Sequence, residues 1–102
     1  MTEEQREQLK GLCCVEVSGE GCANCISLMP VLHSVISARE DLKLVHVEVN
    51  EENKDLISDW EIDRVPTVLL TDDGKIFARC HGFQPEEILE LWIDAKMVDH
   101  KK

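Results

Sequence analysis

The stretch LCCVEVSGEGCANCISLMP, residues 12–30, decides the fold of this 102-residue chain. Its first seven residues form a nearly continuous apolar run, which is typical of a strand covered on both faces. Gly19 and Gly21 then break the strand, and a Cys-Ala-Asn-Cys motif opens the next segment. Apolar side chains recur at helical spacing through Leu28 and Leu32. The stretch therefore predicts a strand, a glycine-bearing loop and a helix.

The same periodicities predict the elements on either side. A capping box at Thr2 opens a short polar helix that stops at Gly11, and Asn50 is a candidate cap for a later helix. The predicted elements are a helix over 2–10, strands over 12–18, 42–49, 65–71 and 75–80, helices over 22–39 and 51–60, and a final helix with Pro85 in its first turn. For the final helix we expect an apolar face made of Ile88, Leu91, Trp92 and Ala95. Right-handed crossovers then give one α/β domain over residues 1–102, a mixed sheet of about four strands flanked by helices on both faces.

Composition argues against two classes of partner. The chain has 21 acidic and 11 basic residues, a formal net charge of −10, whereas nucleic-acid binding rests on clustered Lys and Arg. No apolar run approaches the length of a membrane span, and residues 1–11 are too charged for a signal peptide. We therefore expect a cytoplasmic protein with neither a nucleic-acid nor a membrane partner.

Cys22 and Cys25 form the motif that carries chemistry. Cys22 is expected at a helix N-terminus, where free backbone N–H groups and the helix dipole stabilise a thiolate. Cys25 lies three residues on, close enough to form or open a disulfide with it. Such a thiolate attacks a substrate disulfide and the second thiol resolves the mixed disulfide. Zinc sites use the same spacing, so the motif alone leaves a metal site open.

Several positions taken together resemble the thioredoxin family. The family pattern is a strand with a buried acid, a CxxC that opens a helix with a proline five residues later, a cis-proline strand, a turn glycine and a glycine before the last helix. Those positions here are Glu16, Cys22, Cys25, Pro30, residues 65–67, Gly74 and Gly82. The match covers roughly residues 10–97. It implies a thioredoxin fold, thiol–disulfide oxidoreductase activity in electron transport and cell redox homeostasis, and no cofactor beyond a redox-active Cys22–Cys25 disulfide.

The resemblance also assigns roles to residues. Cys22 would be the attacking nucleophile, Cys25 the resolving thiol, and Glu16 a buried proton acceptor behind Cys25 with its pKa raised by burial. The bond before Pro66 would be cis, and the backbone of Val65 would pair with an extended substrate segment.

Further residues would complete a substrate-binding surface around the disulfide, namely Gly21, Thr67, His81 and Gly82. The implied substrates are protein or small-molecule disulfides, with a thioredoxin-reductase-like enzyme as candidate electron donor. His46 falls where many relatives have a lysine near the buried acid, so it either tunes Glu16 or is an ordinary, partly solvated strand histidine.

The chain departs from the family around its cysteines. Family members commonly have Trp before the first cysteine and Gly-Pro between the two, where this chain has Gly21 and Ala23-Asn24. The changes remove apolar contact surface and alter the rigidity of the redox loop, so the net direction of exchange stays open.

Two alternatives to catalysis follow from the cysteines. One is a metal or iron–sulfur module that uses Cys22, Cys25 and Cys80, with His81 as a further ligand. The other is a thioredoxin-fold interaction module without turnover. Cys13 and Cys14 are adjacent in a strand, so they should point to opposite faces and serve as packing residues.

Overall fold

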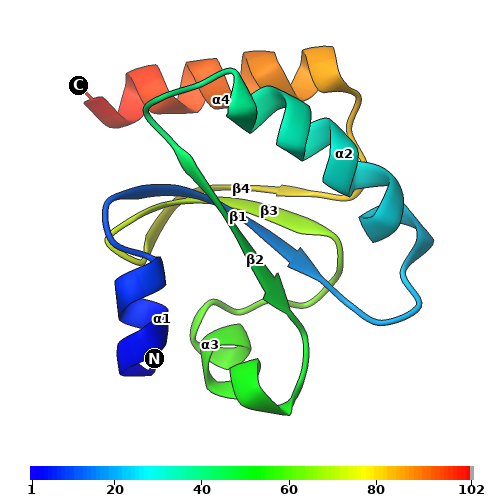
Figure 1. Ribbon diagram of the computed structural model, residues 1–102, viewed down its shortest axis with the longest axis vertical. Coiled ribbons are helices and arrows are strands. Elements are labelled where there is room, and N and C mark those ends of the chain that lie inside the picture. Colours follow the sequence, from blue (N-terminus) through cyan, green and yellow to red (C-terminus); the bar gives the residue numbers. More distant parts are fainter. Residues whose placement is uncertain (102) are drawn as a thin grey trace.

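Four strands form one mixed sheet in the computed structural model, which describes residues 1–101 (Figure 1). The elements in chain order are α1 (Glu3–Gln8), β1 (Leu12–Ser18), α2 (Ala23–Ser37), β2 (Lys43–Glu48), the short 3₁₀ helix η1 (Glu51–Asn53), α3 (Lys54–Asp59), β3 (Thr67–Asp72), β4 (Lys75–His81) and α4 (Glu86–Lys101). The strand order is β2-β1-β3-β4, with β1 parallel to β2 and the other two pairs antiparallel. The predicted α/β architecture is confirmed.

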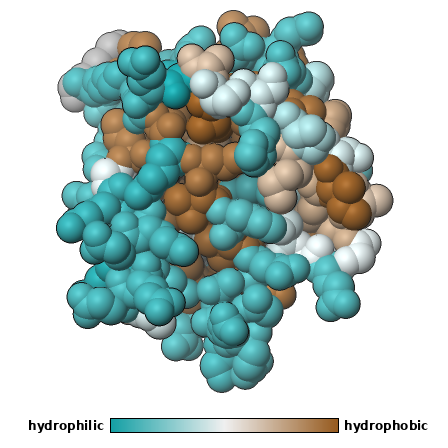
Figure 2. Space-filling model, in the orientation of Figure 1, coloured by the Kyte–Doolittle hydropathy of each residue, from teal (hydrophilic) through white to brown (hydrophobic). Residues whose placement is uncertain are grey.

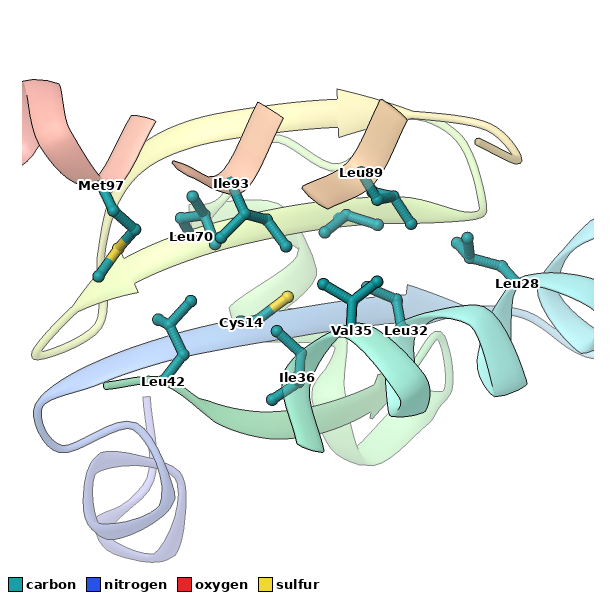
Figure 3. Close-up of a cluster of buried hydrophobic side chains, with 11 residues drawn as sticks. Cys14, Leu28, Leu32, Val35, Ile36, Leu42, Leu70, Leu89, Ile93 and Met97 are labelled. Atoms are coloured by element: carbon teal, nitrogen blue, oxygen red, sulfur yellow. The ribbon is translucent and has the colours of Figure 1, made fainter. Parts of the chain in front are cut away.

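Helices cover both faces of the sheet. Helices α2 and α4 lie on one side, and α1 and α3 lie on the other (Figure 1). Because β1 is central, its side chains alternate between two apolar clusters. Cys14 packs under α2 and α4 (Figure 3), whereas Cys13 packs toward α1 and α3. Both thiols are fully buried on opposite faces, as predicted.

The predicted helix starts are also confirmed. The Thr2 hydroxyl accepts from the backbone N–H of Gln5 at 3.1 Å, and the Gln5 side chain accepts from the backbone N–H of Thr2 at 2.9 Å. The Asn50 side chain accepts from the backbone N–H of Asn53 at 3.1 Å. The helix expected over 51–60 is divided into η1 and α3, since its first turn is 3₁₀.

The expected apolar face of α4 is wrong. Leu89, Ile93 and Met97 are buried, whereas Ile88 is 50% exposed and Leu91 is 68% exposed. The helix carries two apolar stripes, and the stripe at strict i, i+4 spacing is the one that packs on the sheet and α2. Trp92, from the expected face, packs partly against that cluster.

The third strand begins at Thr67, two residues later than predicted. Pro66 has no N–H with which to continue a ladder. The Val65–Pro66 peptide bond is cis, as the family resemblance implied. Among residues 1–101, no helix combines the length and apolar character needed to cross a bilayer.

Candidate active site

Cys22 and Cys25 are joined by a disulfide at the start of α2. Their Cα atoms are 5.2 Å apart, and Cys22 is the N-cap residue whose Sγ accepts from the backbone N–H of Cys25 at 3.2 Å. Cys22 is half-buried and Cys25 is buried. A thiolate at Cys22 would therefore receive the N–H groups and dipole of α2, while Cys25 lies behind it.

Glu16 lies in the layer beneath this helix. It shares a face of β1 with Cys14, which packs against Leu28 and Leu32 of α2. Cys25 is on the same helical face, one turn nearer the start of α2. Because β1 runs toward that start, Glu16 lies nearer to it along the strand than Cys14 does.

The Glu16 carboxyl is a buried polar group in an unusual setting. Its side chain is 1% exposed, and neither carboxyl oxygen has a hydrogen-bond partner within residues 1–101. Burial raises its pKa, while His46 and His33 act in the opposite direction. A buried acid with a raised pKa suits proton transfer near neutral pH.

The loop before Cys22 lies against the segment around Pro66. A Cβ placed on Gly19 would be 3.2 Å from a methyl carbon of Val65, so the Gly19 backbone lies close against the Val65 side chain. The backbone N–H of Gly82 donates to the Pro66 carbonyl at 2.8 Å, which fixes the end of β4 to the same segment. Gly21 has φ +71° and so takes a left-handed backbone conformation directly before Cys22.

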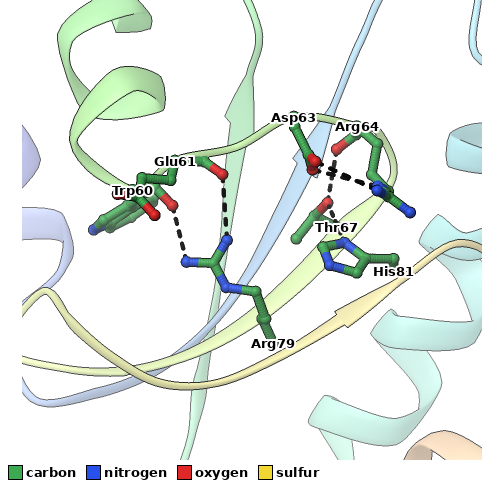
Figure 4. Close-up of polar contacts among 7 residues, drawn as sticks. All are labelled: Trp60, Glu61, Asp63, Arg64, Thr67, Arg79 and His81. Atoms are coloured by element: carbon green, nitrogen blue, oxygen red, sulfur yellow. Dashed lines mark hydrogen bonds and ion pairs between the residues drawn. The ribbon is translucent and has the colours of Figure 1, made fainter.

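The half-buried His81 continues this surface, whereas Thr67 is fully buried beneath it. The Thr67 hydroxyl donates to the Arg64 carbonyl at 2.7 Å and lies 3.2 Å from His81 Nδ1. Figure 4 shows both contacts as dashed lines. Nearby, Arg79 donates to the carbonyl of Trp60 at 2.9 Å (Figure 4). The residues predicted to form the substrate surface are thus brought together: Val65, Pro66, Thr67, His81 and Gly82.

Sequence reasoning missed Ser18. It is a buried polar residue at the end of β1 whose hydroxyl is hydrogen-bonded to His46 Nε2. The available signal was its place two residues after Glu16, since alternate strand residues share a face.

Cys80 is not grouped with Cys22 and Cys25 as a set of metal ligands in the described residues. It is a half-buried free thiol packed beside the α2 and α4 cluster, and burial raises its pKa. Within residues 1–101, no three His, Cys, Asp or Glu side chains are placed to hold a metal ion. The geometry therefore gives no support to the metal alternative.

Comparison with known proteins settles the family. The sequence model of the thioredoxin family matches residues 3–95. The chain belongs to the thioredoxin family. A thioredoxin from Mycoplasmoides gallisepticum is 33% identical over 78 residues, 76% of this chain and 77% of that protein. A thioredoxin from Listeria monocytogenes is 29% identical over 87 residues, 84% of each.

Solved structures agree on the fold. The crystal structure of thioredoxin from Aeropyrum pernix superposes with a TM-score of 0.76 at 18% identity, covering 93% of this chain and 83% of that one. Family membership and the Cys22–Cys25 disulfide together identify a thiol–disulfide oxidoreductase with a redox-active disulfide.

Proposed function

We propose that this thioredoxin-family chain reduces protein disulfides through Cys22 as nucleophile and Cys25 as resolving thiol. The observation that carries the assignment is the unequal placement of the two sulfurs. Cys22 caps α2 and is half-buried, whereas Cys25 is 4% exposed behind it. A substrate disulfide therefore reaches Cys22 first.

The exchange takes two displacements. The Cys22 thiolate attacks one substrate sulfur, so a mixed disulfide forms and the other substrate sulfur leaves as a thiolate. Cys25 loses its proton and attacks Cys22, so the Cys22–Cys25 disulfide forms and the second substrate sulfur leaves. Glu16, as a carboxylate, accepts the Cys25 proton. Its burial beneath α2 and its raised pKa support that role.

Substrate binding is assigned to the surface around Pro66. The backbone of Val65 lies outside β3, next to the loop at Gly19, so its polar groups can pair with an extended substrate segment. Gly21, His81 and Gly82 border the same surface, and the buried Thr67 supports it from beneath through its hydroxyl beside His81. Apolar area is available beside the disulfide, where Ile26 is 74% exposed; Figure 2 shows apolar surface over the start of α2.

The cellular setting is part of the proposal. A carrier of this kind would serve cytoplasmic electron transport, take electrons from a reductase of the thioredoxin-reductase type, and also reduce small-molecule disulfides. The acidic net charge of −10 favours partners with basic docking surfaces.

Reduction of a protein disulfide tests the assignment. With insulin as substrate and dithiothreitol as electron source, we expect catalysed reduction by the parent protein. Cys22→Ser should lower the rate to the dithiothreitol background. Cys25→Ser should keep the first displacement and accumulate a mixed disulfide, detected as a mass increase of the intact protein.

Cys80→Ser is the matched control, because Cys80 is a free thiol outside the disulfide. It should retain the parent rate. Activity that survives Cys22→Ser, or disappears with Cys80→Ser, would contradict the assigned roles.

A further inference from the structure

His46 links the buried carboxyl to the edge of the sheet. It lies on β2, directly beside Glu16 in the parallel ladder. Its Nε2 atom is 3.9 Å from Glu16 Oε1 and is also hydrogen-bonded to the Ser18 hydroxyl. One nitrogen therefore faces both a buried acid and a buried hydroxyl.

Exposure changes sharply along this short path. The Glu16 side chain is 1% exposed and the His46 side chain is 45% exposed. Strand β2 is an edge strand, and His46 is one of its exposed residues. Figure 2 views the molecule from this side, with β2 in front. The imidazole thus lies between a carboxyl that is buried from water and the solvent-exposed surface of the protein.

The groups that face Glu16 leave few other routes for its proton. From β2 the facing group is His46, and from β3 it is the apolar Val68. On β1 the neighbours on the same face are Ser18 and the Cys14 thiol. Burial together with Glu16 raises the pKa of Cys14 to about 12, so it stays protonated. From α2, His33 acts on Glu16 through charge alone, with no contact within hydrogen-bond or ion-pair distance in residues 1–101.

We propose that His46 is the proton exit of Glu16, with Ser18 holding the imidazole in position. The proposal rests on the function proposed above, in which Glu16 receives the Cys25 proton. A neutral histidine has one ring nitrogen that can accept a proton and one that carries a proton to give up, so it can take a proton on one side and release one on the other.

The proton moves in three transfers. It passes from Cys25 Sγ to a Glu16 oxygen as the resolving thiolate forms, then from Glu16 to His46 Nε2, which leaves an imidazolium beside a carboxylate. The imidazolium loses a proton to water from Nδ1. The Ser18 hydroxyl donates to an unprotonated Nε2, turns away as the Glu16 proton arrives, and then accepts from the protonated Nε2 through its oxygen. Proton exchange with water returns the imidazole to the Nδ1–H tautomer before the next transfer. A small side-chain shift or one water closes the 3.9 Å gap.

The test isolates the resolving step. Reduced protein in a Cys80→Ser background is mixed with dithiobis(nitrobenzoate), which releases one coloured thiolate when Cys22 attacks and a second when Cys25 attacks. The second phase reports the step that needs the proton exit. It is measured for the parent, His46→Gln, Ser18→Ala and the matched control His33→Gln, between about pH 5 and pH 8.

We expect His46→Gln to slow the second phase about tenfold at neutral pH, a modest share of the roughly 10²–10⁴-fold attributed to acid–base catalysis. The first phase should be unchanged. Adding imidazole to the buffer should restore the second phase in His46→Gln and leave the parent unaffected. Ser18→Ala should shift the pH profile of the second phase in the same direction as His46→Gln does, with a smaller loss of rate. The control His33→Gln should have the rate and the pH profile of the parent.

The outcomes separate the two levels of proposal. A second phase equal in His46→Gln and His33→Gln would overturn the proton exit, and so would a slowed phase that imidazole does not restore and whose pH profile is unmoved. Absence of a second phase in the parent would instead overturn the roles of Cys22 and Cys25. Thermal unfolding of each variant confirms that it is folded.

Discussion

The two faces of β1 differ in what they contain. The side chains toward α1 and α3 are Cys13, Val15 and Val17, all apolar and fully buried. The side chains toward α2 are Leu12 and Cys14 followed by Glu16 and Ser18, so this face changes from apolar to polar along the strand toward the start of α2. One face of β1 therefore serves only to pack the core. The other face packs the core at one end and supplies the polar groups of the proposed active site at the other.

The difference shows how the fold tolerates a buried acid. Unpaired buried carboxyls are costly, and Glu16 has no hydrogen-bond partner in residues 1–101. The apolar layer on the opposite face, together with Cys14, Leu28 and Leu32 on its own face, supplies the packing that offsets this cost. Variants that act on one face at a time test the comparison.

The adjacent leucines of β3 provide the largest expected effect. Leu69 faces the α1 and α3 layer, Leu70 faces the α2 and α4 layer, and both are fully buried. Leu69→Ala and Leu70→Ala should each lower the free energy of unfolding by about 2–5 kcal/mol, measured by urea unfolding. Both should retain insulin reduction where they remain folded. A large loss of activity in folded Leu69→Ala would break the comparison.

Glu16→Gln tests the polar end of the second layer. We expect the resolving step to slow by about a hundredfold, because the amide cannot accept the Cys25 proton. Although Glu16→Gln should lower the rate, it should raise the free energy of unfolding relative to the parent. Burial raises the folded-state pKa above the ordinary value of 4.5, so the folded parent binds more protons than the unfolded chain above that pH.

The parent therefore loses stability as pH rises from about 4.5 through the folded-state pKa, and Glu16→Gln does not. The stability difference, variant minus parent, should grow in favour of the variant across this range. Urea unfolding of both oxidised proteins at several pH values measures it. Parallel stability curves would show that the carboxyl is not held in its neutral form.

Arg39 tests the far end of the same layer, away from the disulfide. Its guanidinium donates to Asp41 at 2.9 and 3.0 Å and also contacts Asp94 of α4. Arg39→Gln should lower the unfolding free energy by about 1 kcal/mol, less in about 0.5 M salt, with no change in activity. A salt-independent loss would point to packing of the side-chain stem instead.

Thr2 provides the smallest effect, on the structural face. Thr2→Ala removes the hydroxyl that caps α1 and should cost roughly 0.5 kcal/mol of stability. Hydrogen exchange should increase in α1 and stay unchanged at the start of α2. Altered exchange around Cys22 would mean that the two layers are coupled more tightly than their packing indicates.

The sequence predicted most elements because local signals agreed with the fold. The caps at Thr2 and Asn50, the glycines around Cys22 and the nearly continuous apolar run of β1 are each read from near neighbours in the sequence. The face of α4 could not be predicted in the same way. Ile88 and Leu91 compete with Leu89 and Ile93 at helical spacing, and only the direction in which α4 crosses the sheet selects between them.

The contact between Ser18 and His46 lay beyond sequence reasoning for a related reason. The two residues are 28 positions apart, and they meet only because the parallel register places Glu16 beside His46. A shift of one residue would turn His46 to the other face of the sheet.

The edge position of β2 has a consequence for self-association. An unpaired strand edge is a template for another chain, and natural sheets protect such edges with charged or ionisable side chains. Here the exposed side chains of β2 are Lys43, His46 and Glu48. A fifth strand added against β2 would bury the imidazole and remove its access to water. The proposed proton exit therefore requires that no further strand pairs with β2. The same three side chains also disfavour fibre-like association through this edge.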